Sequence, residues 1–236
     1  MNSSKIPTLY IVATPIGNLG DMTFRAVEVL KSVDLILCED TRVTRNLLKH
    51  FEIDKPTDSF HRKSNPQKVE KIIEKLRNGQ NLALVSDAGT PGLSDPGNEL
   101  ISKVLELLGD EVEIISIPGP SSLTALISVS GLNMTKFQFW GFTPQKKGRN
   151  KFFGKLLDSE IPVVFFESPH RLIKNLKLLQ ELSLEREAKP NLVVGRELTK
   201  MFEEVKRGNV DEILEYFETN PDKVRGEFVV IGENKK

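Results

Sequence analysis

The feature that most constrains the fold is a regular alternation of short apolar runs with longer amphipathic segments. Apolar residues recur every three or four positions in the segments 23–33, 65–79 and 98–109, which is typical of helices that bury one face. Short apolar runs of strand length separate or flank them, at residues 9–13, 34–38, 82–86 and 112–117. Strands that alternate with helices in this way predict a mostly parallel sheet covered on both faces.

The segment 65–79 shows how clearly some of these helices are delimited. Asn65 is a good N-cap, and Pro66 suits the first helical position because that position needs no backbone N–H donor. Gly79 follows the last periodic residue, where a helix commonly ends in the left-handed conformation. The local sequence therefore predicts both ends of this helix.

The pattern changes after "PGPSS", residues 118–122. Residues 136–142 alternate like an exposed edge strand, and further strands and helices follow at 122–131, 162–166, 171–182, 191–195, 210–217 and 227–232. We therefore predict an α/β fold with two α/β domains, residues 1–116 and 117–236, with mostly parallel and mixed sheets and a hinge near Pro118–Pro120. One continuous sheet over the whole length is the alternative.

Composition narrows the class of protein. The 236 residues include 33 basic and 33 acidic side chains, so the net charge of zero counts against a protein that binds mainly to nucleic-acid phosphates, although a local basic patch is compatible with it. Cys38 is the only cysteine, which excludes an internal disulfide framework and favours a cytoplasmic protein. We find neither a signal-peptide pattern nor an apolar run near the ~18 residues that span a bilayer. The three histidines lie far apart, and we expect no metal site.

Polar and glycine-rich clusters follow six of the predicted strands. They read "TPIGNLGD", "EDTR", "SDAGTPGLSDPG", "PGPSS", "ESPHR" and "GRELTK". In open α/β sheets, ligands bind at the carboxyl ends of the strands. A single cluster of this kind is often only a turn or a helix cap, but six of them together predict a binding site.

The cluster at residues 86–97 has more glycine than a simple turn requires. Gly89, Gly92 and Gly97 lack Cβ atoms, so a ligand could approach the backbone closely. Asp87 stands at the strand end as a carboxylate for a cationic or hydroxyl-bearing ligand. Asp95 or Ser94 is better interpreted as a cap of the helix that begins near Pro96.

Familiar catalytic motifs are absent from the sequence. The first loop, "ATPIGNLGD", is not G-x-G-x-x-G, and the chain contains neither a G-x-x-x-x-G-K-[ST] loop nor a G-x-S-x-G elbow. Cys38 follows an apolar run, where a buried structural thiol is expected. A site without a metal cluster or covalent nucleophile suits a cofactor that brings its own reactivity.

The six clusters together resemble the tetrapyrrole-methylase superfamily of S-adenosylmethionine-dependent methyltransferases. The match runs from Leu9 to about Gly232, with the motifs in the family's order. "DAGTPGLSDPG" with "ESPHR" is similar to the branch that methylates the ribose 2′-hydroxyl of a cytidine in 16S ribosomal RNA of the small ribosomal subunit. The resemblance implies S-adenosylmethionine bound in a cleft between the two domains, and a homodimer. Many relatives of this branch continue beyond the point that matches Lys236 into a small extra domain.

The resemblance also implies roles for particular residues. Glu167 and Glu197 are candidate bases or hydroxyl-orienting groups, and Arg42, Arg171 and Lys200 could hold phosphates; a salt-bridge network of the same residues is the alternative. The complete candidate catalytic set is Arg42, Glu167, His170, Arg171, Glu197 and Lys200. The candidate cofactor-binding residues are Pro15, Ile16, Asp87, Thr90, Gly92, Ser121, Ser122, Phe166, Leu198 and Phe228.

A basic segment, "FTPQKKGRNKFF" at 142–153, is the candidate RNA-binding loop. Lys146, Lys147, Arg149 and Lys151 are clustered there in an otherwise neutral chain, and Gly148 favours a mobile loop. A second basic loop at 61–68 contains Arg62 and Lys63. We expect the neighbouring aromatic residues to belong to the core rather than to stack on bases.

Two other functions remain open from the sequence. One is the same methyl transfer to a tetrapyrrole or another small molecule. The other is a non-catalytic protein that binds RNA or the ribosome and has kept the cofactor cleft. Binding of S-adenosylmethionine separates the second of these from an enzyme.

Overall fold

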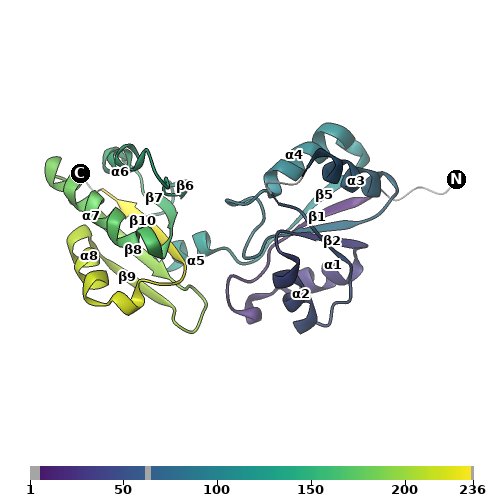
Figure 1. Cartoon of the computed structure of the whole chain (residues 1–236), viewed down its shortest axis with the longest axis horizontal. Coiled ribbons are helices and arrows are strands. Elements are labelled where there is room, and N and C mark those ends of the chain that lie inside the picture. The colour runs from purple at the N-terminus through teal and green to yellow at the C-terminus, as the bar shows by residue number, and fades with distance from the viewer. Residues whose placement is uncertain (1–5, 62–64, 235–236) are drawn as a thin grey trace. The chain divides into compact units, whose positions relative to one another are not determined.

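The structure, a computed structural model, describes residues 6–61 and 65–234 (Figure 1). The chain divides into two compact units, unit 1 (Met1–Ser121) and unit 2 (Ser122–Lys236). Each unit contains its own five-stranded sheet, so the alternative of one continuous sheet is wrong. The division lies a few residues beyond the expected boundary between residues 116 and 117.

Unit 1 is built on an entirely parallel sheet with the strand order β3-β2-β4-β1-β5. Its strands are β1 (Thr8–Val12), β2 (Leu35–Cys38), β3 (Thr57–Ser59), β4 (Leu82–Val85) and β5 (Glu113–Ile117). Every residue of β2 and β4 is buried, as expected for central strands of a sheet that is covered on both faces.

Helices cover both faces of this sheet (Figure 1). Ile72 of α3 and Leu100 of α4 pack with Leu9 in one core cluster, and Leu30 of α1 and Leu48 of α2 belong to the other. The helices are α1 (Phe24–Ser32), α2 (Thr41–His50), α3 (Pro66–Arg77) and α4 (Gly97–Leu108), with short 3-10 helices η1 (Leu19–Asp21) and η2 (Gly109–Glu111). Asn65 caps α3 and Gly79 follows it at φ +79°, so both predicted ends are confirmed.

Unit 2 is built on a mixed sheet with the order β6-β7-β10-β8-β9, in which only β6 and β7 run parallel. Its strands are β6 (Gln138–Phe142), β7 (Val163–Glu167), β8 (Asn191–Arg196), β9 (Glu204–Asn209) and β10 (Phe228–Glu233). The expected edge strand at 136–142 is confirmed as β6.

Three helices pack on one face of the second sheet around a core that includes Phe153, Leu176 and Phe217. On the other face, Leu126 of α5 lies so close to Gly195 that a Cβ there would be 2.8 Å from its Cδ1. The helices are α5 (Ser122–Val129), α6 (Arg149–Asp158), α7 (Pro169–Glu185) and α8 (Val210–Thr219), with the 3-10 helix η3 (Pro221–Lys223).

Two helices, α2 and α6, and two strands, β3 and β9, were not expected from the sequence. The expectation of a mobile loop over 142–153 is wrong for its second half, because α6 begins at Arg149. Phe153, Leu156 and Leu157 are spaced three and four positions apart and bury one face of this helix. β9 has little apolar alternation and forms by pairing with β8.

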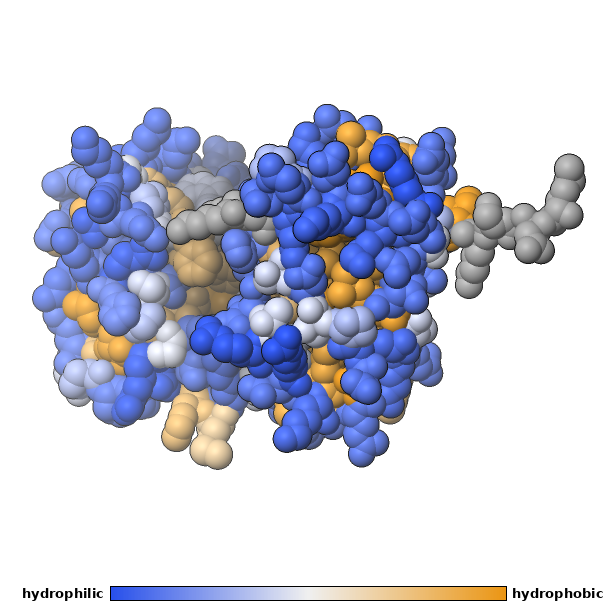
Figure 2. All heavy atoms as spheres, turned by 45° about the vertical axis from the view of Figure 1, so that its right-hand side comes forward, coloured by the Kyte–Doolittle hydropathy of each residue, from blue (hydrophilic) through white to orange (hydrophobic). Residues whose placement is uncertain are grey.

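Hydrophilic residues cover most of the surface in the view of Figure 2. Within residues 6–61 and 65–234, none of the helices has the length and apolar character needed to cross a bilayer.

Candidate functional site

The loops that follow β1 and β4 are joined at the carboxyl edge of the unit 1 sheet. Thr14 and Gly89 exchange two backbone hydrogen bonds, with N···O distances of 3.0 and 3.1 Å. The Thr14 hydroxyl donates to the carbonyl of Ser86 at 3.1 Å, and the Ser86 hydroxyl donates to that of Gly89 at 3.1 Å. These bonds bring the predicted cofactor residues Pro15 and Ile16 beside the β4 loop.

The loop after β5 also contacts the loop after β4. The Thr90 hydroxyl donates to the carbonyl of Pro120 at 3.1 Å. A Cβ on Gly89 would lie 3.2 Å from Cγ2 of Ile16 and 3.6 Å from the Pro120 oxygen. Unit 1 therefore brings together six of the predicted cofactor-binding residues, namely Pro15, Ile16, Asp87, Thr90, Gly92 and Ser121.

Gly92 is held by a neighbouring carboxylate. Both oxygens of Asp95 accept from the Gly92 N–H at 2.8 Å, and Oδ1 also accepts from the N–H of Gly97 at 2.7 Å. Asp95, rather than Ser94, therefore serves the first turn of α4. Gly92 has φ +93°, and a Cβ there would have no heavy atom within 4 Å. Packing within the protein does not require glycine at this position, whereas the positive φ does, and the space beside it is open.

Asp87 lies exposed at the end of β4 and contacts the loop after β2. Its Oδ1 accepts from the backbone N–H of Asp40 at 3.0 Å. Asp40 is the N-cap of α2, accepting from the Arg42 N–H at 2.8 Å, and it also pairs with the Arg42 guanidinium at 2.6 Å. The hydrogen bonds from Arg42 lower the pKa of Asp40 to about 2. Arg42, a candidate phosphate ligand, is on an exposed helix turn with its side chain 87% accessible.

These residues suit S-adenosylmethionine. The left-handed, open backbone at Gly92 would let main-chain groups contact an adenosine, and the exposed Asp87 carboxylate would hold a hydroxyl or a cationic group. Among the described residues, no hydrogen bond engages Oδ2 of Asp87, and Oδ1 serves Asp40. The remaining carboxylate oxygen is a hydrogen-bond acceptor with negative charge, so it fits a ligand that carries both hydroxyls and positive charge.

Glu167, a candidate base, lies in a buried network of unit 2. Its side chain is 1% exposed. Oε2 accepts from the hydroxyl of Thr143 at 2.8 Å and from the amide of Asn175 at 2.5 Å. Oε1 accepts from the Ser168 N–H at 2.7 Å and lies 3.3 Å from Nε of Arg171. These contacts occupy both oxygens of the carboxylate.

Two more predicted residues lie at the start of α7. Arg171 donates to the Ser168 hydroxyl at 3.1 Å and to the Thr143 carbonyl at 3.2 Å, so its guanidinium is engaged within unit 2. His170, the neighbouring residue, is exposed. Of this pair, His170 is the side chain that is presented to solvent.

Glu197 and Lys200 lie in the loop between β8 and β9. The Lys200 ammonium donates to Glu197 and to Glu227, each at 2.9 Å. The N–H of Glu227 also donates to Glu197 at 2.9 Å. Glu197 itself has φ +50°, and a Cβ at Gly226 would collide with its carboxylate. Glycine at 226 therefore makes room for the Glu197 side chain.

This cluster favours the charged state of both partners. Burial raises the pKa of Glu197, but the hydrogen bonds from Lys200 and from the Glu227 N–H outweigh it, so that the net pKa is lowered. Burial likewise lowers the pKa of Lys200, and its bonds to Glu197 and Glu227 reverse that effect and raise it. A carboxylate with a lowered pKa is a poor proton acceptor.

The remaining predicted cofactor residues belong to unit 2 and differ in exposure. Phe228 is 2% exposed and packs 5.8 Å from Phe217 in the core, so its side chain is committed to packing. Leu198 is 7% exposed, whereas Ser122 and Phe166 are partly exposed. Phe166 contacts Phe139 and Phe142 at ring distances of 5.0 and 5.2 Å.

The predicted RNA-binding residues are Lys146, Lys147, Arg149 and Lys151 in unit 2, and Arg62 and Lys63 in the second loop. Lys146 and Lys147 precede α6, and Arg149 and Lys151 lie in its first turn. Arg62 and Lys63 lie outside the described residues. In residues 6–61 and 65–234, no group of three or more His, Cys, Asp or Glu side chains is placed to hold a metal ion.

Sequence reasoning missed Thr143 and Asn175, which surround Glu167. Asn175 is 3% exposed and lies on the buried face of α7, between Leu172 and Leu179. A polar residue in an otherwise apolar stripe was the signal that could have found it. Arg196 was also missed: it is 7% exposed and donates to the carbonyls of Arg225 and Phe202 at 3.0 and 3.2 Å, which fixes the β8–β9 loop.

Residues 8–214 match the family model of the tetrapyrrole (corrin/porphyrin) methylases. The chain belongs to this family. Members of the family depend on S-adenosylmethionine, so the expected fold and cofactor are confirmed. The glycine-rich loop after β4 is accordingly part of a methylase fold.

Curated relatives extend this result. Ribosomal RNA small subunit methyltransferase I of Synechocystis sp. is 46% identical over 225 residues, which cover 94% of this chain and 77% of that protein. The protein of the same name from Thermotoga maritima is 41% identical, and the alignment covers 97% of this chain and 99% of that protein. The resemblance deduced from the six clusters is thereby confirmed.

Solved structures show the same fold at low identity. The methyltransferase CobJ has a TM-score of 0.67 at 16% identity, covering 97% of this chain and 94% of that chain. Cobalt precorrin-4 methyltransferase has a TM-score of 0.65 at 18% identity, covering 99% and 97%. Similarity at this level of identity concerns the fold alone.

Proposed function

We propose that this methylase transfers a methyl group from S-adenosylmethionine to the ribose 2′-hydroxyl of a cytidine in 16S ribosomal RNA of the small ribosomal subunit. One observation carries the proposal. Relatives that are 41–46% identical over 94–98% of this chain are named ribosomal RNA small subunit methyltransferase I. The cytidine and the 2′-hydroxyl come from the resemblance of the motifs "DAGTPGLSDPG" and "ESPHR" to one branch of the family.

Transfer to a ribose hydroxyl depends mainly on positioning. When bound, S-adenosylmethionine supplies a methyl group attached to a positively charged sulfur. We propose that unit 1 holds it through Asp87, Thr90 and the backbone around Gly92, where three loops are joined by hydrogen bonds. Phe166, Leu198 and Phe228 are proposed contacts from unit 2, Phe228 through its backbone because its side chain is buried.

The chain's own residues would orient the acceptor hydroxyl. Glu167 is buried with both oxygens occupied, and Glu197 has a lowered pKa, so neither is well prepared to accept a proton. We therefore assign Glu197 and Lys200 to hydroxyl orientation and phosphate binding, and Glu167 to holding Arg171 and Thr143. The exposed Arg42 and His170 remain available to a large substrate.

Two further features are proposed. The single cysteine favours an enzyme that acts in the cytoplasm, and the family resemblance implies a homodimer. Light scattering of the purified chain tests the dimer: a monomeric mass at the concentration used for activity would contradict it.

The decisive experiment incubates the purified chain with methyl-labelled S-adenosylmethionine and small ribosomal subunits from a strain that lacks the modification. We expect label in 16S RNA, and mapping should place it on the ribose of one cytidine. Label on a base, or on a tetrapyrrole supplied instead of the subunits, would contradict the proposal. Calorimetry with S-adenosylmethionine detects the remaining alternative, since a non-catalytic binding protein has no need of the cofactor.

A further inference from the structure

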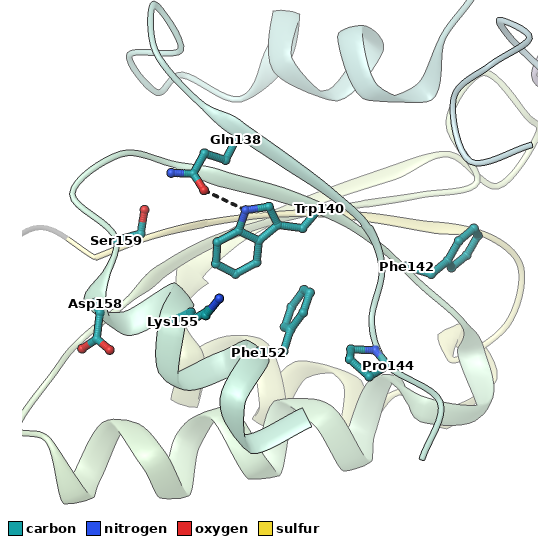
Figure 3. Close-up of a pocket in the computed structure, with 8 residues that line it drawn as sticks. All are labelled: Gln138, Trp140, Phe142, Pro144, Phe152, Lys155, Asp158 and Ser159. Carbon is teal, nitrogen blue, oxygen red and sulfur yellow. Dashed lines mark hydrogen bonds between the residues drawn. The ribbon is translucent and has the colours of Figure 1, made fainter. Parts of the chain in front are cut away.

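An aromatic groove lies within unit 2, between β6 and α6. It encloses about 620 Å³, within the usual range of roughly 300–1,000 Å³ for small-molecule sites. Figure 3 shows its lining, which includes Gln138, Trp140, Phe142, Phe152, Lys155 and Asp158. The volume suffices for a nucleotide.

The geometry of β6 explains why aromatic rings reach this groove. Gln138 and Trp140 lie two residues apart, so their side chains point to the same face of the strand. A register shift between Phe139 and Phe142 then breaks the alternation, and the Phe142 ring contacts Phe166, as Phe139 does. Phe142 still lines the groove, but its ring lies apart from Trp140 (Figure 3). β6 is an edge strand, so no further strand of the described chain covers this side. Phe142 is 56% exposed, which contradicts its expected place in the core.

The rings are held in place before any ligand binds. Trp140 and Phe152 contact edge to face, with centroids 5.1 Å apart and an interplanar angle of 82°. Phe152 also packs against Phe153 and Phe165 at 5.2 and 5.4 Å. The Trp140 N–H donates to Gln138 at 2.8 Å, so its polar atom is already satisfied and its ring lies beside open space (Figure 3).

The charges around the groove favour an anion. Lys155 lines it, and four more basic residues, Lys146, Lys147, Arg149 and Lys151, precede it in the same segment. No ion pair joins any of the five to a described residue. Of the two acidic residues in 144–161, Asp158 is paired with Arg186 at 2.8 Å and Glu160 is exposed. The basic side chains therefore remain available to an external partner.

We propose that this groove binds an unpaired nucleobase of single-stranded RNA, which stacks on Trp140, while the nucleotide contacts the exposed ring of Phe142 and Lys155 and the residues before α6 hold its phosphates. Aromatic rings beside unpaired cations are the combination that proteins use for single strands, because every base has a stacking face and every linkage an anion. The inference rests on the proposed RNA substrate and specifies how that substrate is held by residues outside the candidate catalytic and cofactor-binding sets.

Trp140 is the only tryptophan, so its fluorescence reports on this groove alone. We would titrate the full chain with a single-stranded RNA 12-mer, with the duplex of the same sequence, and with an abasic 12-mer that carries phosphates without bases. The single strand should quench the fluorescence. The duplex and the abasic strand should leave it nearly unchanged, because neither offers a free base.

Affinity is measured separately from the anisotropy of a labelled RNA. Phe142→Ala removes an exposed ring from the lining and should weaken single-strand binding about fivefold, the scale of losing one contact between a nucleotide and an aromatic ring, and Lys155→Gln should weaken it as well. Leu184→Ala removes a similarly exposed apolar side chain, 74% accessible, on α7 and should bind like the wild type. All three variants change exposed residues, so that folding is not at risk.

The outcomes separate this inference from the proposed function. If the wild type methylates small subunits while Phe142→Ala binds single strands normally and no RNA alters the fluorescence, the groove is not a base site. Quenching by single strands with no methylation of subunits would instead contradict the proposed function alone. A response to an extended apolar peptide and not to RNA would overturn the inference, because it would assign the edge strand β6 to a protein partner.

Discussion

The carboxylate of Asp87 lies 3.0 Å from the backbone nitrogen of Asp40, and this hydrogen bond joins the loop after β4 to the N-cap residue of α2. Asp87 therefore has one role that the structure shows, in joining the two loops, and a second that we propose, in binding the cofactor. Its exposed position at the strand end leaves Oδ2 for a ligand.

Asp87→Ala should weaken S-adenosylmethionine binding by about 1–3 kcal/mol, the scale for losing a charged hydrogen-bond partner. Asp87→Asn keeps an oxygen for the Asp40 N–H and removes the charge, so it should retain thermal stability and still bind more weakly. Isothermal calorimetry and thermal melts of both variants provide the test. Wild-type affinity in a folded Asp87→Ala protein would remove Asp87 from the cofactor site.

Gly92→Val should abolish cofactor binding, because φ +93° is unfavourable for a β-branched residue and the side chain would fill the open space beside the loop. Gly79 offers a matched control. It has φ +79°, a Cβ there would also have no heavy atom within 4 Å, and it precedes the amino end of β4. Gly79→Val should lose similar stability but keep its affinity; equal affinities of both variants would show that the 92 loop is only a turn.

Glu167→Ala should destabilise unit 2 by about 3 kcal/mol or more, since it leaves Arg171 without its buried carboxylate and Asn175 and Thr143 without an acceptor. Denaturant unfolding monitored through Trp140 measures this. Glu160→Ala, at an exposed position, is the control and should change stability little. If Glu167→Ala kept its stability but lost activity, the structural role would be contradicted and a catalytic role of Glu167 supported.

Neutralising Lys146, Lys147 and Arg149 together should weaken binding to small ribosomal subunits and reduce its salt dependence by roughly 0.7–0.9 log–log units per lost phosphate contact. Cofactor affinity should stay the same. The exposed residues Lys31, Lys174 and Lys189 provide a control triple variant with the same change of charge. Wild-type methylation by the first triple variant across a salt series would show that this segment does not bind RNA.

The pKa of Asp40 predicts a pH dependence. Because Arg42 lowers this pKa from 3.8 to about 2, the ionised carboxylate stabilises the folded state fully above about pH 4, and the contribution is lost as the pH falls toward 2. Arg42→Ala should return the pKa toward 3.8, and Arg45→Ala on the same helix should not. The pKa of Asp40 is measured in each protein by following its carboxyl chemical shift by NMR as the pH is changed. The same Asp40 pKa in the wild type and in Arg42→Ala would contradict the assignment.

Much of the candidate site was predictable because it depends on local features of the chain. The strand-end clusters after β1, β4 and β5 come together because parallel strands bring their carboxyl ends to one edge. Asp95 accepts from the N–H of Gly97, the first residue of α4, although Pro96 is the N-cap residue itself. The partners of Glu167 were not predictable, since Thr143 and Asn175 come from other parts of the chain and only packing brings them within 2.8 and 2.5 Å.

The sequence by itself determined the parallel sheet of unit 1, the two-part α/β organisation and the family. Each of these depends on patterns that lie within short segments of the chain, namely the spacing of buried residues and the motifs at strand ends. Tertiary structure decided the rest. β9 has little apolar alternation and exists by pairing with β8, and the aromatic groove exists because β6 is an edge strand that α6 only partly covers. Such features depend on which distant segments become neighbours, and contacts between distant segments leave no periodic signal in either one.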